Sequence, residues 1–183
     1  MAVLSRRTLI ALAAASALPP LARAQAPAVP PEVAAALPGA TLQGSGRLRF
    51  IGLAVYDARL WRGAAPVGAD WMAAPLALEL AYLRGLVGRQ IAERSIKEMR
   101  RQRNLTDDEA SRWLTAMLQV FPDVKEGDRI TGFVVPGMGA RFAVNGTPKG
   151  DVRDLEFARL FFGIWLSEKT SEPALRRALL GLA

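Results

Sequence analysis

The 183-residue sequence contains neither histidine nor cysteine. These two absences exclude a Ser-His-Asp triad, a thiolate nucleophile and an ordinary zinc site, because each of them requires one of the missing side chains. Without cysteine the fold has no disulfide, so the burial of apolar side chains must hold it together. Any acid-base chemistry is left to tyrosine, lysine, arginine and the carboxylates.

The sequence also lacks a glycine-rich phosphate loop between a strand and a helix. Gly44-Ser45-Gly46 has two glycines of a dinucleotide fingerprint but not the third, and it leads into a strand pattern. The chain is basic, with a formal charge of +7, yet its aromatic residues fall in apolar patterns rather than along a basic stripe. The sequence therefore predicts no cofactor, no metal and no nucleic-acid partner.

The first 24 residues have the pattern of an export signal. Arg6 and Arg7 precede an apolar run, residues 9–18, that is too short to span a bilayer. Ala22-Arg23-Ala24 is the small-x-small pattern of a signal-peptidase site, and the arginine pair also fits a twin-arginine signal. We therefore expect residues 1–24 to be a signal peptide that is cleaved after Ala24, and the mature protein to be periplasmic.

Residues 25–39 are rich in alanine and proline, and this composition predicts a tether. One domain is predicted over residues 40–183, since that length suits a single core. The pattern from Thr41 to Trp61 is extended, with apolar side chains on both faces in its middle and Gly52 as a candidate β-bulge. Residues 75–83 alternate again and predict a second strand.

Two helices are predicted after these strands. Residues 88–103 combine an apolar stripe with many arginines. Thr106 begins a second helix with the capping-box pattern Thr-Asp-Asp-Glu, and Pro122 ends it. The polar face of the first helix is basic enough to be a candidate surface for a partner or a membrane.

Turn signals at residues 136–139 and at Asn145-Gly146 predict two hairpins between short apolar runs. A helix that is apolar almost all round is predicted over residues 155–166, and a last short helix begins at Pro173 and ends at Gly181. Strands come early, helices in the middle, hairpins next and helices last. This order predicts an α+β domain, an antiparallel β-sheet with helices packed on one face.

Three segments together carry a family resemblance: GSGRLRFIGLAVYDARLW (44–61), GDRITGFVVPGMGARFAVNG (127–146) and FARLFFGIWLSEKTSEPALRRALLG (157–181). In their order and spacing, the chain resembles the chalcone isomerase-like proteins of bacteria from about Leu42 to Gly181. The resemblance implies the chalcone isomerase fold, a large antiparallel sheet wrapped by helices around an apolar cleft. This expectation agrees with the α+β prediction.

The plant enzymes of this family close a ring by the attack of a phenolate on an enone. The resemblance implies that an arginine after a Gly-x-Gly segment steadies the anion, and here that position is Leu48, flanked by Arg47 and Arg49. The other polar groups of the enzymes are a tyrosine, a lysine, an asparagine and a threonine, which here fall near Ile91, Arg94, Glu98 and Phe162. Most of the polar apparatus is missing, so the chain resembles the non-catalytic, fatty-acid-binding members of this fold.

The candidate ligand-binding residues are Arg49, which we favour, Arg47, Tyr56 and Arg94; no catalytic residue is assigned. Arginine suits a carboxylate because its planar fork binds both oxygens. The alternatives stay open: a solvated strand end for Arg47 and Arg49, a solvated helix face for Arg94, and a core position with its hydroxyl at the rim for Tyr56. Arg59 is expected to pair with Asp57 along its strand.

Three hypotheses follow for the function. The first is a periplasmic protein that binds a small acidic ligand with an apolar tail, such as a fatty acid. The second is an isomerase or intramolecular lyase that uses Arg49 and a bound water to steady an oxyanion. The third is a protein that binds a partner or a membrane surface through the basic helix 88–103. The first is favoured because an arginine and the apolar helices are present while the acid-base groups are not. The sequence gives no information about the oligomeric state.

Overall fold

The structure is a computed structural model that describes residues 27–182. Six strands form one sheet in the order β1-β2-β3-β4-β5-β6, and each pairs antiparallel with the next strand of the chain. The strands are β1 (Thr41–Phe50), β2 (Leu53–Arg62), β3 (Leu76–Tyr82), β4 (Arg129–Val135), β5 (Gly139–Val144) and β6 (Thr147–Val152). The helices are α1 (Pro31–Ala36), α2 (Gly88–Gln102), α3 (Asp107–Val120), α4 (Leu155–Leu166) and α5 (Pro173–Leu180). The predicted α+β class with an antiparallel sheet is confirmed.

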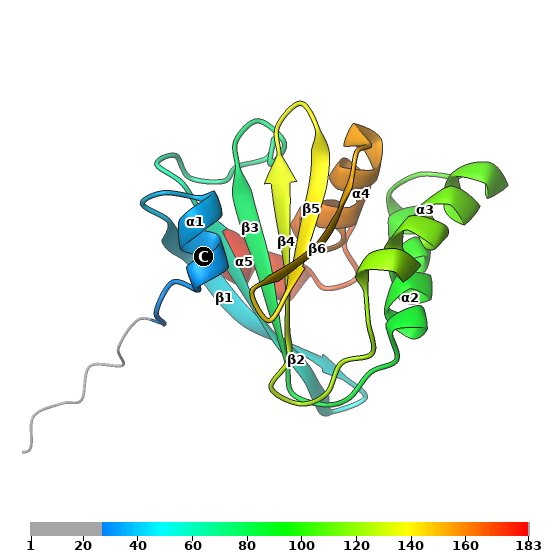
Figure 1. Cartoon of the computed structure of the whole chain (residues 1–183), viewed down its shortest axis with the longest axis horizontal. Coiled ribbons are helices and arrows are strands. Elements are labelled where there is room, and N and C mark those ends of the chain that lie inside the picture. The colour runs from blue at the N-terminus through cyan, green and yellow to red at the C-terminus, as the bar shows by residue number, and fades with distance from the viewer. Residues whose placement is uncertain (1–26, 183) are drawn as a thin grey trace, which may run out of the picture.

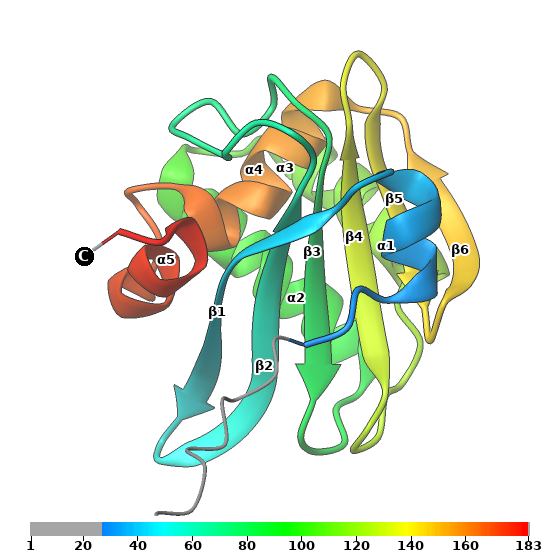
Figure 2. The same cartoon turned by 90° about the vertical axis from the view of Figure 1, so that its left-hand side faces the viewer.

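The sheet separates two hydrophobic clusters of unequal size. Helices α2 to α5 supply the larger cluster together with one face of the sheet, as predicted, and α1 lies over the opposite face (Figures 1 and 2). Helix α4 is the centre of the larger cluster because it is apolar almost all round. The ring of its Phe161 lies 5.4 Å from that of Phe157 and 5.5 Å from that of Trp165, centroid to centroid.

The predicted extended segment from Thr41 to Trp61 is a hairpin rather than one strand, which corrects the sequence-based prediction. The chain reverses at Ile51 and Gly52, whose φ angles are +48° and +76°. Gly52 therefore serves the turn and not a bulge; it can do so because glycine, without a Cβ, enters the left-handed region freely. The register between β1 and β2 shifts instead between Leu48 and Arg49.

Residues 31–36, placed by composition in a tether, form helix α1, which packs on the sheet. Pro31 stands at the start of the helix, where a missing N–H costs nothing. Val33 is fully buried and Leu37 nearly so, and the Glu32 carboxylate accepts a hydrogen bond of 2.7 Å from Arg129 on β4. Burying a valine stabilises a fold by about 1.5–3 kcal/mol, so this segment is part of the domain. The predicted signal peptide and its cleavage site lie outside the described residues.

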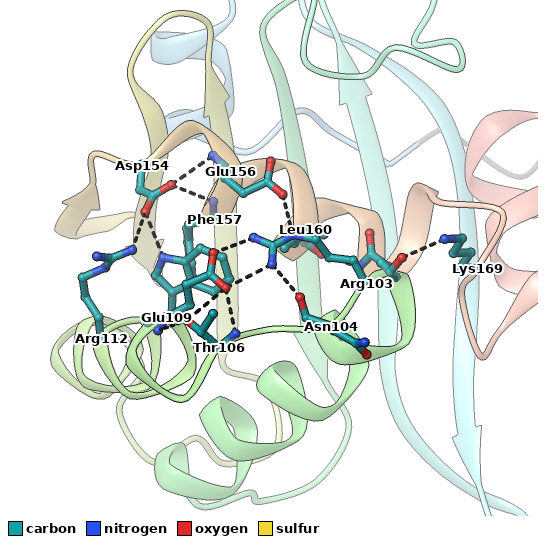
Figure 3. Close-up of polar contacts among 12 residues, drawn as sticks. Arg103, Asn104, Thr106, Glu109, Arg112, Asp154, Glu156, Phe157, Leu160 and Lys169 are labelled. Atoms are coloured by element: carbon teal, nitrogen blue, oxygen red, sulfur yellow. Dashed lines mark hydrogen bonds and ion pairs between the residues drawn. The ribbon is translucent and has the colours of Figure 1, made fainter.

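A polar network joins the ends of α2, α3 and α4 (Figure 3). The Arg103 guanidinium, directly after α2, donates to Glu109 at 2.8 Å and to Glu156 at 2.8 Å. Thr106 and Glu109 form the predicted capping box of α3, and Asp154 caps α4 by accepting from two backbone N–H groups. The network therefore ties the end of α2 to the beginnings of α3 and α4.

Candidate functional site

A cavity of about 370 Å³ lies between the sheet and the helical layer. Strands β1 to β4 form its floor, and helices α2 and α4 form its walls together with Phe121, which follows α3. Most of the lining is apolar; Leu80, Ile130 and Phe161 are examples that come from three different elements. A cavity of this size and lining is typical of a small-molecule site.

Tyr56 lies in the floor of the cavity and is fixed there by its neighbours. Its hydroxyl accepts a hydrogen bond of 2.9 Å from the Trp165 indole N–H, and its ring meets Tyr82 edge-on at 5.8 Å. Burial raises the pKa of Tyr56 well above the usual value, and that of Tyr82 likewise. At neutral pH, Tyr56 is therefore an uncharged hydroxyl at the inner surface of the cavity.

Arg94 and Glu98 bring charge to the cavity from one face of α2. The Arg94 guanidinium contacts Glu98 Oε1 at 2.7 Å, and it lies 5.9 Å above the ring of Phe50. Only 7% of Glu98 is exposed. Its second oxygen, Oε2, lies 3.6 Å from Arg101 but has no hydrogen-bond partner among the described residues. The α2 wall thus presents a cation whose charge is partly balanced and a carboxylate oxygen able to accept a hydrogen bond.

Arg84 also lines the cavity, and the sequence-based reasoning missed it. It is exposed, lies two residues after the end of β3, and forms no ion pair within residues 27–182. The sequence offered only a weak signal, an arginine before a glycine between a strand and a basic helix. Arg84 is the cavity-lining cation whose charge is not balanced by a carboxylate in the described part of the chain.

Of the predicted site residues, the structure brings Tyr56 and Arg94 to the cavity and leaves Arg47 and Arg49 away from it. Leu48 and Phe50 line the cavity, and the arginines alternate with them, so their side chains point to the opposite face of β1. Arg47 donates two hydrogen bonds to Asp57, at 2.6 and 2.8 Å. Arg49 is exposed and donates to the backbone oxygen of the hairpin turn at 3.3 Å. Both arginines therefore correspond to the alternative interpretation, in which they belong to a strand end that faces solvent.

The predicted pairing of Arg59 with Asp57 is also corrected. Arg59 instead donates to Glu79 on the neighbouring strand β3, at 2.8 Å. Glu79 is almost fully buried, and its other oxygen accepts from the Trp61 indole at 2.8 Å. Residues directly opposite each other on paired strands are closer partners than residues two apart on one strand, and Arg59 is opposite Glu79 in the register.

The arrangement suits the binding of an elongated amphipathic molecule. The apolar interior suits an apolar tail, and the arginines of the lining suit an acidic group. Within residues 27–182, no three His, Cys, Asp or Glu side chains are grouped so that they could hold a metal ion. In the same part of the chain, no helix combines the length and the apolar character needed to cross a membrane.

Comparison with known proteins agrees with this architecture. A family model described as chalcone isomerase-like matches residues 28–181. The crystal structure of a fatty-acid binding protein from Arabidopsis thaliana resembles this structure with a TM-score of 0.62 and 15% sequence identity, over 78% of this chain and 87% of that chain. A search among curated proteins found no match. At 15% identity the structural likeness shows the fold alone.

Proposed function

Because the chain belongs to the chalcone isomerase-like family, we propose that it is a binding protein for a small acidic ligand with an apolar tail, such as a fatty acid. The observation that carries this proposal is the cavity of about 370 Å³, apolar inside and bordered by Arg84 and Arg94. Small-molecule sites have volumes of about 300–1,000 Å³ and a few convergent polar groups in an apolar lining. The fatty-acid binding of the Arabidopsis protein of the same fold supports the same ligand class.

The geometry supports binding better than it supports ring closure. An isomerase must hold an oxyanion with donors that are free to meet it. The Arg94 guanidinium is in contact with Glu98 at 2.7 Å, so it is already engaged. The Tyr56 hydroxyl, which accepts from Trp165, leaves its own O–H as a single neutral donor. Ile91 and Phe162, which stand where the enzymes have polar groups, add no donor. A ligand whose acidic group meets Arg84 requires none of these groups to react.

We place this binding protein in the periplasm, on the basis of the export signal in residues 1–24. The compartment and the ligand can be tested on one sample. The full gene is expressed with its signal, and the protein recovered from the periplasm is examined by native mass spectrometry. We expect a chain that begins at Gln25 and carries a bound acid. A chain that retains Met1 would contradict export and leave the binding proposal standing.

The cavity itself is tested by filling it. Val55 is buried on β2 and lines the cavity, so Val55→Phe places a ring where the ligand tail would lie. Calorimetric titration with dodecanoate should show binding to the wild type and a loss of about tenfold or more in the variant, because several buried methylene contacts are lost. Urea unfolding checks that the variant is folded. Absence of dodecanoate binding by the wild type, or equal binding by a folded variant, would refute the proposal.

A further inference from the structure

Tyr82, the last residue of β3, has a hydroxyl group that the fold does not use. Its side chain lines the cavity and is only 2% exposed. Among the residues that the structure describes, none forms a hydrogen bond with this hydroxyl. A buried tyrosine usually has a partner for its O–H. The unpaired hydroxyl of Tyr82 therefore indicates a partner that comes from outside the chain, and the cavity is where a ligand could supply it.

The neighbouring tyrosine of the cavity floor shows what a paired hydroxyl looks like in this fold. Tyr56 is directly opposite Tyr82 in the register of β2 and β3, and the two rings meet edge-on at 5.8 Å. The Tyr56 hydroxyl accepts a hydrogen bond of 2.9 Å from the Trp165 indole. The two tyrosines are therefore matched in position and burial, but only one of them has its hydroxyl engaged by another side chain of the described part of the molecule.

Tyr82 lies between a cation and an apolar part of the cavity lining. Arg84 is two residues beyond Tyr82, past the end of β3, at the end of the sheet that also holds the β1–β2 turn (Figure 2). In the opposite direction, the next residue of β3 on the same face is Leu80, which pairs with Ile130, and both line the cavity. Strand positions two residues apart are separated by about 7 Å. A chain whose acidic group meets Arg84 therefore passes Tyr82 with its first few carbons.

We propose that the ligand is a fatty acid with a hydroxyl group close to its carboxylate, and that Tyr82 recognises this hydroxyl. The inference deepens the proposed function and rests on it, since it concerns the ligand of the same cavity. A tyrosine hydroxyl both donates and accepts a hydrogen bond, so it is complementary to an alcohol. A plain fatty acid would cover the Tyr82 hydroxyl with methylene groups, and a buried polar group without a partner is unfavourable.

Glu98, the buried carboxylate of the lining, is a less suitable partner for such a hydroxyl. One of its oxygens is in contact with Arg94 at 2.7 Å, and the other lies 3.6 Å from Arg101. Its charge is therefore already shared with two cations. Tyr82 has no comparable contact for its hydroxyl within residues 27–182, so it gains more from a ligand oxygen than Glu98 does.

The test compares three acids of equal chain length: dodecanoate, 3-hydroxydodecanoate and ω-hydroxydodecanoate. Calorimetric titration of the wild type should show that 3-hydroxydodecanoate binds about tenfold more tightly than dodecanoate, because it gives the Tyr82 hydroxyl a partner. The ω-hydroxy acid should not share this advantage, since its hydroxyl is at the far end of the tail, away from Tyr82. Tyr82→Phe removes only the hydroxyl, so in this variant the preference for 3-hydroxydodecanoate over dodecanoate should disappear.

Tyr56→Phe is the matched variant for the stability of the fold. It removes the hydroxyl that accepts from Trp165, so the urea unfolding midpoint of the ligand-free protein should fall. Tyr82→Phe should leave that midpoint unchanged or raise it, because it breaks no hydrogen bond that the described residues form. An equal fall in both variants would mean that the Tyr82 hydroxyl already has a partner in the fold, and this result would overturn the inference.

The titrations distinguish a failure of this inference from a failure of the proposed function. Equal binding of dodecanoate and 3-hydroxydodecanoate by the wild type would overturn the inference and leave the binding proposal standing. The same holds for a preference that persists in Tyr82→Phe, and for a wild type that binds the ω-hydroxy acid most tightly. A wild type that binds none of the three acids would refute the proposed function, and this inference with it.

Discussion

At the scale of single residues, Arg84 and Arg94 line the same cavity but differ in their partners. Arg94 is in contact with Glu98 at 2.7 Å, whereas Arg84 has no carboxylate partner among the described residues. We therefore expect Arg84→Gln to weaken dodecanoate binding by about 1–2 kcal/mol, toward the lower part of the range for a charge-assisted hydrogen bond because the group is exposed. Arg94→Gln should cost less. Calorimetric titration of both variants measures the two effects.

Arg47→Gln is the control for this comparison. Arg47 is half-exposed, is paired with Asp57 and lies on the face of β1 that points away from the cavity. Its loss should leave dodecanoate affinity unchanged. A loss of affinity in Arg47→Gln that matched the loss in Arg84→Gln would mean that the ligand lies outside the cavity.

Of the four predicted site residues, Tyr56 and Arg94 line the cavity. The sequence could not decide whether Arg47 and Arg49 face the cavity or solvent. Alternation along β1 separates Leu48 from Arg47 and Arg49, but it does not say which face meets the helices. That choice depends on where the chain reverses. Once the turn stands at Ile51 and Gly52, Leu48 and Phe50 face the helical layer and the arginines face solvent.

At the scale of elements, the junction of α2, α3 and α4 makes stability depend on pH. The Arg103 guanidinium, and secondarily the Thr106 backbone N–H, lower the pKa of Glu109 to about 2 from an ordinary value of about 4.3. A lowered pKa in the folded state means that folding favours the ionised carboxylate. Its contribution is present above the unfolded pKa and is lost as the pH falls through the folded pKa.

We therefore expect Glu109→Gln to be less stable than the wild type at pH 7, and the difference to shrink as the pH falls from about 5 to about 2. Urea unfolding of both proteins across this range measures the difference. Ser111→Ala, an exposed change on the same helix, should be insensitive to pH. A gap between wild type and Glu109→Gln that stays constant down to pH 2 would contradict the role given to the Arg103 contact.

Elements with strong local signals were predicted well, and elements that depend on distant contacts were not. The capping box of α3 and the Asp154 cap of α4 involve residues within one turn, so the sequence contains all that they need. Helix α1 depends on the contact of Glu32 with Arg129, far along the chain. Its alanine and proline composition is typical of a tether, and the local sequence does not show that the sheet buries Val33.

At the scale of the whole molecule, the sheet follows the order of the chain, and this is why the fold class could be predicted. Every strand pairs with its neighbour in sequence, so hairpin signals and the order of elements were sufficient. The position of the cavity required more. It depends on how the helices pack on the sheet, and that packing involves residues far apart in the sequence, such as Tyr56 of β2 and Trp165 of α4.

The cavity as a whole also decides between binding and catalysis. Ring closure of a chalcone requires a phenolate held beside an enone and a group that stabilises the developing negative charge. Here burial raises the pKa of Tyr56, so its hydroxyl stays protonated at neutral pH; it accepts from Trp165 and offers one neutral O–H, which is a weaker stabiliser of an anion than a free cation would be. The Glu98 carboxylate holds the Arg94 guanidinium at 2.7 Å, so this cation is not free to stabilise an oxyanion. These features oppose the reaction while they leave room for an apolar tail.

We therefore expect no stereoselective ring closure of a hydroxychalcone above the spontaneous rate at pH 7. Conversion is followed by absorbance and the product by chiral chromatography, with dodecanoate titration of the same sample as evidence that the cavity is intact. Glu98→Gln removes the negative charge and keeps a side chain of similar size, so it serves as the matched variant. An enantiomerically enriched product from the wild type would show that the cavity is catalytic. Enrichment from Glu98→Gln alone would mean that the Glu98 charge by itself prevents the reaction in an otherwise competent cavity.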